Sequence, residues 1–297
     1  MRSGVGHRRC RTLLAALTLA LLAAPAMAID VDALWLYSKP DVSERRFRAA
    51  LVDASDDERL ILQTQIARTY GLRGEFDRAR QIIAVVAPVL ENASAEVRVR
   101  YFLELGRTYA SPVHRPETQT AEVRETARGH YMRAFALAEA AQLDALAIDA
   151  LHMMPMVDTT PEQQLEWDQR ALEYMEKSRQ PDAWKWEASL RNNLGHAKRL
   201  QGDYDGALEQ FRLSRLAHEK RGNTRNVRIA DWMIARTYRA MDRIDDAIAL
   251  QLELERAWNA DGEPDPYVYE ELALLFRAKG DEQRAAHYEA LHRAAAK

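Results

Sequence analysis

The chain of 297 residues is 47% hydrophobic and holds only 12 glycines and 10 prolines. So few turn-forming residues favour long helices and disfavour a β-rich fold. The formal net charge of −3 disfavours a protein that binds the phosphate backbone of nucleic acids. We therefore expect a helical protein with no nucleic-acid partner.

Residues 1–28 have the pattern of a secretory signal peptide. Ala26-Met27-Ala28 has the small-x-small form of a cleavage site, an apolar run extends from Leu13 to Ala24, and four arginines precede it: Arg2, Arg8, Arg9 and Arg11. The Arg8-Arg9 pair lacks the continuation of a twin-arginine signal, so general secretion is favoured. We expect an exported protein, periplasmic or secreted, that begins at Ile29 after cleavage. An uncleaved segment would tether the same domain on the same side of the membrane.

Cleavage after residue 28 would change the formal net charge from −3 to −7, because four arginines and no acidic residue would be lost. The single cysteine, Cys10, lies in the same segment, so the mature chain would have neither a disulfide nor a thiol-bound metal. Beyond residue 28 no apolar run reaches the 18 residues that indicate a membrane span. We therefore expect a mature chain without a membrane span that folds by packing alone.

A short pattern recurs along the chain. IARTY stands at 66–70 and at 234–238, LGRTY stands at 105–109, and looser copies stand at 194–198 and 272–276. The second residues of these copies are 39, 89, 40 and 38 positions apart, and the interval of 89 fits two periods with one degenerate copy. About six units of about 40 residues are typical of a helical solenoid.

Each well-formed unit has a second half in which a turn residue precedes an alanine by five positions. The pairs are Gly74 and Ala79, Gly202 and Ala207, Asp242 and Ala247, and Gly280 and Ala285. Glycine or aspartate can end the first helix in a left-handed turn, and alanine lets two helices cross closely. Neither helix of a unit can bury its apolar stripe alone, so several units must stack.

These residues resemble tetratricopeptide repeats. The family pattern of small-x-x-aromatic, then Gly-x-aromatic-x-x-Ala, then an aromatic residue is matched closely by Gly195, Gly202, Tyr204, Ala207 and Phe211. The family spacing is 34 residues, so a period of about 40 implies longer helices or loops. The resemblance implies an all-α, right-handed superhelical solenoid of antiparallel helix pairs.

The signal pattern and the resemblance together divide the chain into a signal peptide at 1–28, a helical lead-in at 29–58 and a repeat domain at 59–297, whose unit at 143–180 is degenerate. Capping-box spacings at Asp41 to Glu44, Ser55 to Glu58 and Thr160 to Gln163 predict helix starts, as do Asp182 and Asp265. The insertion at 111–122 is the longest expected loop, either a tolerated surface insertion or a place for local function.

Catalytic patterns are absent from the sequence: it has no phosphate-binding glycine loop, no nucleophile elbow and no His-Glu-x-x-His. The run His152-Met153-Met154-Pro155-Met156 contains soft ligands suited to Cu(I), but flexible core packing is the favoured interpretation. We expect no enzyme activity, no cofactor and no metal.

In tetratricopeptide arrays the first helices of the units line a concave groove, and the resemblance implies which positions point into it. Carried over to this sequence, the groove positions that we select as peptide-binding are Arg68, Arg107, Asn192, His196, Arg199, Trp232, Arg236, Arg239 and Arg277. Arginine suits bidentate recognition of carboxylates, so we predict an acidic segment or a C-terminal carboxylate as ligand. The alternative is that these arginines pair with acidic residues of adjacent helices.

Two function classes remain open. The favoured one is a non-catalytic scaffold of the cell envelope that binds a protein or peptide segment in the groove. The alternative is a ligand- or metal-responsive regulatory module associated with an envelope enzyme or a secretion system.

Overall fold

A computed structural model describes residues 29–295. Within that range the chain is helical and has no strand, so the all-α fold predicted from the sequence is confirmed. The predicted signal peptide at 1–28 lies outside the described residues. No helix within 29–295 has both the length and the apolar composition needed to cross a membrane.

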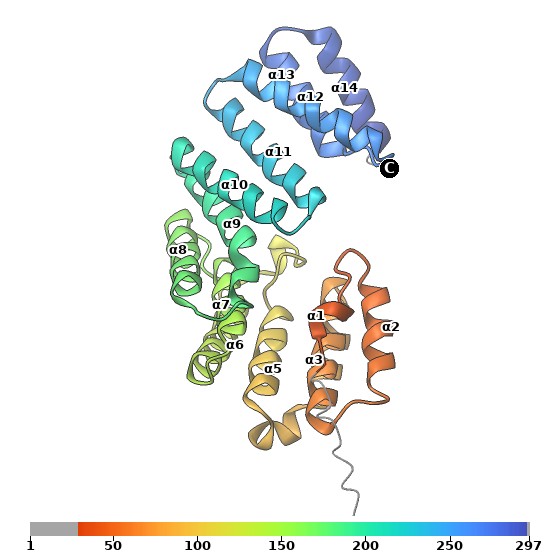
Figure 1. Cartoon of the computed structure of the whole chain (residues 1–297), viewed down its shortest axis with the longest axis vertical. Coiled ribbons are helices and arrows are strands. Elements are labelled where there is room, and N and C mark those ends of the chain that lie inside the picture. Colours follow the sequence, from red (N-terminus) through yellow and green to blue (C-terminus); the bar gives the residue numbers. More distant parts are fainter. Residues whose placement is uncertain (1–28, 296–297) are drawn as a thin grey trace, which may run out of the picture.

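Twelve of the helices form consecutive pairs, and each pair packs against the next (Figure 1). The pairs are α3 (Asp56–Leu72) with α4 (Phe76–Ile83), α5 (Ala95–Arg107) with α6 (Ala121–Ala140), α7 (Asp144–His152) with α8 (Pro161–Lys177), α9 (Glu187–Leu200) with α10 (Tyr204–Glu219), α11 (Thr224–Ala240) with α12 (Ile244–Ala260), and α13 (Pro266–Ala278) with α14 (Glu282–Ala295). This stacking buries apolar stripes that a single pair would leave exposed. The short helix α1 (Val31–Leu34) and α2 (Pro40–Ala50) precede the first pair.

The turns within the pairs follow the sequence pattern. Positive φ angles, from 58° to 82°, occur at the four turn residues that precede the alanines: Gly74, Gly202, Asp242 and Gly280. The four alanines that follow them are at most 1% exposed. Close crossing also explains two glycines on first helices: a Cβ atom at Gly106 would lie 2.7 Å from Tyr131 Cε1, and one at Gly195 would lie 2.7 Å from Phe211 Cε1.

The predicted helix starts have different outcomes. Capping boxes are present at Ser55 and Thr160, and the Asp265 side chain accepts a hydrogen bond from the Tyr267 amide at the start of α13. The capping box predicted at Asp41 is wrong, because α2 begins at Pro40. Asp41 lies in its first turn and forms an ion pair with Arg45 instead.

Four short 3-10 turns lie between the helices: η1 (Ala87–Asn92), η2 (Pro116–Thr118), η3 (Met154–Met156) and η4 (Ala183–Trp186). The insertion at 111–122 contains η2 and packs back on the repeats, because the His114 ring stacks on Phe76 with centroids 3.7 Å apart. Met153 and Met154 are buried in a hydrophobic cluster, as the core-packing interpretation of these methionines expects.

Candidate functional site

The predicted groove residues gather in two places on the first helices. Arg68 of α3 and Arg107 of α5 belong to a group that we call the N-terminal charge cluster, made of Arg68, Glu104, Arg107 and Asp149. The second group, the C-terminal arginine cluster, consists of Arg199, Arg236 and Arg239 together with Glu271.

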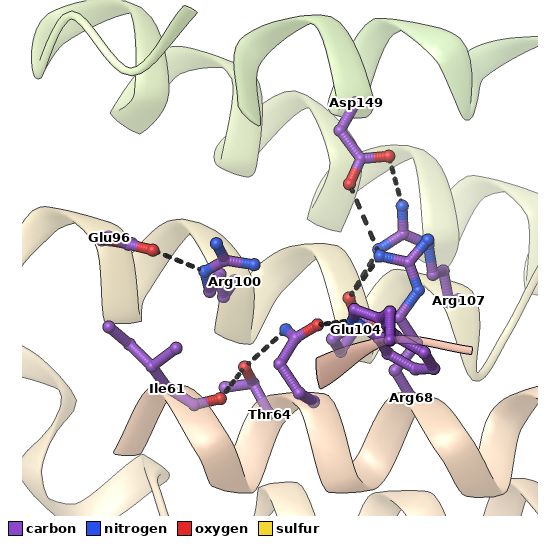
Figure 2. Close-up of polar contacts among 10 residues, drawn as sticks. Ile61, Thr64, Arg68, Glu96, Arg100, Glu104, Arg107 and Asp149 are labelled. Atoms are coloured by element: carbon purple, nitrogen blue, oxygen red, sulfur yellow. Dashed lines mark hydrogen bonds and ion pairs between the residues drawn. The ribbon is translucent and has the colours of Figure 1, made fainter. Parts of the chain in front are cut away.

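In the N-terminal charge cluster, Arg107 bridges two buried carboxylates. Its Nη1 donates to Glu104 Oε1 over 2.6 Å, and its Nη2 donates to Asp149 of α7. Arg68 is held less closely, with Nη1 3.7 Å from Glu104 Oε1 and 4.0 Å from Asp149 Oδ2. Figure 2 shows how α3, α5 and α7 each direct a charged side chain to this point.

The protonation of this cluster follows from burial and charge. Burial alone would raise the pKa of Asp149, but the charges of Arg107 and Arg68 outweigh it and the pKa is lowered. Burial alone would lower the pKa of the Arg107 guanidinium, but the negative charges of Asp149 and Glu104 outweigh it and the pKa is raised. Arg107 is therefore a charged residue inside the fold, and its side chain is only 10% exposed.

This cluster forms part of the wall of a cavity of about 730 Å³. Trp35 and Tyr37, which follow α1, stack on each other with ring centroids 4.6 Å apart. The Arg68 guanidinium lies 5.5 Å from the Trp35 centroid and 5.4 Å from that of Tyr37, within the range of a cation–π contact. Trp186 of η4 also lines the cavity. The lead-in thus contributes aromatic residues to a cavity built on the first three helix pairs.

The C-terminal arginine cluster has more positive than negative charge. Glu271 of α13 is buried, and Arg239 of α11 binds it through two nitrogens, with Nη2 3.3 Å from Oε2. Arg236 Nε lies 3.6 Å from the same oxygen. Within residues 29–295 no ion pair joins Arg199 to a carboxylate, so three guanidinium groups face one carboxylate.

The pKa of Arg199 is lowered from its ordinary value. Partial burial lowers the pKa of its guanidinium, and the neighbouring charges of Arg236 and Arg239 lower it further. The Nε atoms of Arg199 and Arg236 are buried without a hydrogen-bond partner in the part of the chain that the structure describes. Groups whose pKa is shifted by burial and neighbouring charges are more frequent at functional sites.

The other predicted residues lie around this cluster or away from it. Trp232 stands against Arg236, whose guanidinium lies 4.5 Å from the ring centroid. His196 is near enough for Arg199 and Arg236 to add to the lowering of its pKa by burial. Asn192 is one turn before His196 on the same helix and is partly exposed. Arg277 points elsewhere, because it pairs with Glu289 and Glu282 of α14.

Sequence reasoning missed the carboxylates that organise both clusters. Glu104 and Glu271 each stand two positions before the small residue of their unit, as do Gln65 and Asn193. Gln65, Glu104 and Glu271 are all buried. A polar residue at that position, on an otherwise apolar helix face, was the available signal. Among residues 29–295 no group of three His, Cys, Asp or Glu is arranged to hold a metal ion.

Solved structures with a similar fold are tetratricopeptide-type repeat proteins. One is a signal transduction ATPase with a tetratricopeptide repeat sensor from Pyrococcus horikoshii, with a TM-score of 0.62 and 12% identity over 86% of this chain and 39% of that one. Another is the apo form of RapI, with a TM-score of 0.63 and 10% identity over 89% and 75% of the two chains. The chain has a tetratricopeptide-like repeat fold.

A third similar structure is aspartyl phosphate phosphatase F from Bacillus subtilis, with a TM-score of 0.54 and 15% identity over 88% of this chain and 68% of that one. Identities this low establish the repeat fold and carry no ligand to this chain. The chain spans 39% of the length of the Pyrococcus protein. Neither a protein-family model nor a curated protein sequence matches the chain.

Proposed function

We propose that this protein is a non-catalytic binding module that holds an acidic protein or peptide segment on its first helices, at the C-terminal arginine cluster. The observation that carries the proposal is the convergence of three arginines on the single carboxylate of Glu271. An anionic group of a ligand would relieve the repulsion among the guanidinium groups and supply acceptors for their free N–H donors.

The surroundings of the cluster suit a peptide chain. Trp232 and Tyr267 lie beside the arginines with ring centroids 6.2 Å apart, and Tyr267 is exposed. Aromatic rings next to arginine supply contact area at binding surfaces. Asn192 and His196 offer hydrogen-bonding groups on the adjacent helix α9, which fits recognition of a ligand backbone.

Export belongs to the same proposal. Its support is the arrangement of arginines, apolar run and small-x-small residues in 1–28, which is typical of secretory signals. The partner would then be a protein or peptide of the cell envelope or the exterior. The alternative, a ligand-responsive regulatory module, is favoured by a different observation, the cavity beside the N-terminal charge cluster.

Binding can be tested with three labelled six-residue probes: a glutamate peptide with a free C-terminus, its amidated form and a lysine peptide. We expect the glutamate peptide to bind, the lysine peptide not to bind, and affinity to fall with salt because exposed charges are screened. Arg199→Gln should weaken binding by about tenfold, the effect of one charged hydrogen bond. A preference for the free C-terminus over the amide would identify terminal-carboxylate recognition.

The matched control is Arg256→Gln, because Arg256 is exposed on the second helix α12. It should leave the affinity unchanged. Arg199→Gln should also leave the unfolding midpoint unchanged or raise it, because it removes a like charge and no ion pair. Equal affinities for the glutamate and lysine peptides would refute the proposal, as would equal effects of the two substitutions.

A further inference from the structure

The cavity of about 730 Å³ lies within the size range of small-molecule sites, and nothing in the proposed peptide binding uses it. Its walls come from residues far apart in the chain, including Trp35, Arg68, Asp149 and Trp186. The Asp32 carboxylate is joined to Lys185 Nζ of η4 over 3.0 Å. This ion pair connects the lead-in to η4, so the cavity is formed by the lead-in and the repeats together.

Most of the charged groups in the cavity wall already satisfy one another. Arg100 Nε is 2.8 Å from Glu96, Arg107 is bound by Glu104 and Asp149, and Lys185 is 2.9 Å from Asp182. Their charges leave little net attraction for a simple anion or a simple cation.

Among the described residues, Arg68 is the arginine of this wall that has no carboxylate oxygen within hydrogen-bond distance. Its nearest carboxylate oxygens lie at 3.7 Å and 4.0 Å, beyond hydrogen-bond length, and its buried Nε has no partner among the residues described. The side chain is 18% exposed. The guanidinium therefore has donors to offer to an acceptor in the cavity, and it is held in place by Trp35 and Tyr37.

Glu104 has the complementary property. Its residue exposure is 3%, its Oε1 is used by Arg107, and its Oε2 is buried without a partner within residues 29–295. A buried carboxylate oxygen without a donor is costly. An ammonium or amide donor of a ligand would satisfy it, next to the point where Arg68 would bind an acid group.

We infer that this cavity binds a small zwitterion, an α-amino acid or dipeptide with an apolar side chain. Arg68 binds the carboxylate, Glu104 accepts a hydrogen bond from the ammonium group, and the aromatic residues of the lead-in and η4 cover the apolar part. Leu146 and Met153 add apolar surface to the same cavity. This site is separate from the C-terminal arginine cluster, so it stands whether or not that cluster binds a peptide.

The test uses calorimetry on the full chain with four probes. L-phenylalanine and L-phenylalanyl-L-leucine carry both charged groups, 3-phenylpropanoate lacks the ammonium group, and phenethylamine lacks the carboxylate. We expect at least one zwitterion to bind, and each one-charge analogue to bind about tenfold more weakly than L-phenylalanine or the dipeptide. Absence of binding by both zwitterions, or equal affinity for the analogues, overturns the inference.

Two substitutions assign the contacts. Arg68→Gln should weaken binding of the zwitterion and abolish its advantage over phenethylamine, because the lost contact is to the carboxylate. Glu104→Gln should abolish the advantage over 3-phenylpropanoate instead. If these residues had only a structural role, each substitution would lower the affinity for all probes by the same factor. That result overturns the assignment.

Arg100→Gln is the matched control, since Arg100 lines the same cavity but is already bound to Glu96. It should leave the affinity for the zwitterion unchanged. Should Glu104→Gln unfold the protein, the probe series on the unaltered chain together with Arg68→Gln still decides the question. A peptide-binding result at Arg199 has no bearing on this outcome, so the two proposals can fail separately.

Discussion

Replacing Arg107 with methionine keeps most of the side-chain length and removes the charge that joins two buried carboxylates. The side chains of Glu104 and Asp149 are 2% and 6% exposed, so water in the adjacent cavity replaces only part of the lost contacts. Removing one member of a buried ion pair costs about 3–5 kcal/mol. Arg68 remains at 3.7 Å and 4.0 Å from these carboxylates, which places the expected loss near the lower end of that range.

The loss should depend on pH in a definite direction. In the native protein the pKa of Asp149 is lowered, so its contribution to stability is present above the unfolded pKa and is lost as pH falls through the folded pKa. Without Arg107, burial favours the neutral carboxyl groups, which form at acidic pH. Arg107→Met should therefore destabilise the fold more at pH 7 than at pH 4.

Urea denaturation at both pH values measures this effect, with Arg100→Met as the control. Arg100 pairs with Glu96, whose side chain is 36% exposed, so its loss should cost about 1 kcal/mol or less. Equal effects of the two substitutions at both pH values would refute the reasoning. Such a result would leave Arg107 available as a binding residue rather than a structural one.

Three further predictions concern packing, protonation and export. Ala207→Leu should lower the free energy of unfolding by about 1–3 kcal/mol, because Ala207 is fully buried where an added side chain overpacks a helix crossing; an unchanged denaturation midpoint would contradict this. Burial raises the pKa of Asp168 to about 7, with Asn193 opposing the shift. Its contribution to stability is therefore greatest at acidic pH and is lost as pH rises toward 7. Asp168→Asn should stabilise the fold by about 1–3 kcal/mol at pH 8 and have little effect at pH 4, as thermal unfolding at both pH values would reveal. A reporter fused to residues 1–30 should cross the cytoplasmic membrane, and mass spectrometry should find Ile29 as the mature N-terminus; a cytoplasmic reporter would exclude export.

The sequence was sufficient to predict the helical repeats because their signals are local. A turn residue and an alanine five positions later identify where two helices of a pair meet, and Asp242 takes a positive φ angle there as the glycines do. The start of α2 was not predicted correctly, since Asp41 and Glu44 have capping-box spacing but belong to a helix that begins at Pro40. Spacing alone does not determine which residue is the first of a helix.

The candidate sites were less predictable because their contacts join distant parts of the chain. Lys185 of η4 pairs with Asp32 across 153 positions, and Trp35 donates a hydrogen bond to Gln65 from outside the repeats. Neither contact follows from the repeat pattern. The lead-in at 29–58 was predicted as a helical segment, and its residues Trp35 and Tyr37 line the cavity.

Arginines at equivalent positions of the repeat have different surroundings. Arg68, Arg107 and Arg236 each follow the small residue of a first helix, but the acidic residues near them differ in number and placement. Arg107 has Glu104 three positions earlier on its own helix and Asp149 on the next first helix. Arg236 shares the single Glu271 with Arg239 while Arg199 adds another positive charge. An arginine such as Arg107, which is hydrogen-bonded to buried carboxylates, stabilises the fold, and one such as Arg199, whose buried Nε has no partner among the described residues, keeps donors for a ligand. Which of the two an arginine does therefore depends on the carboxylates of its own helix and of the next first helix, and not only on its position in the repeat.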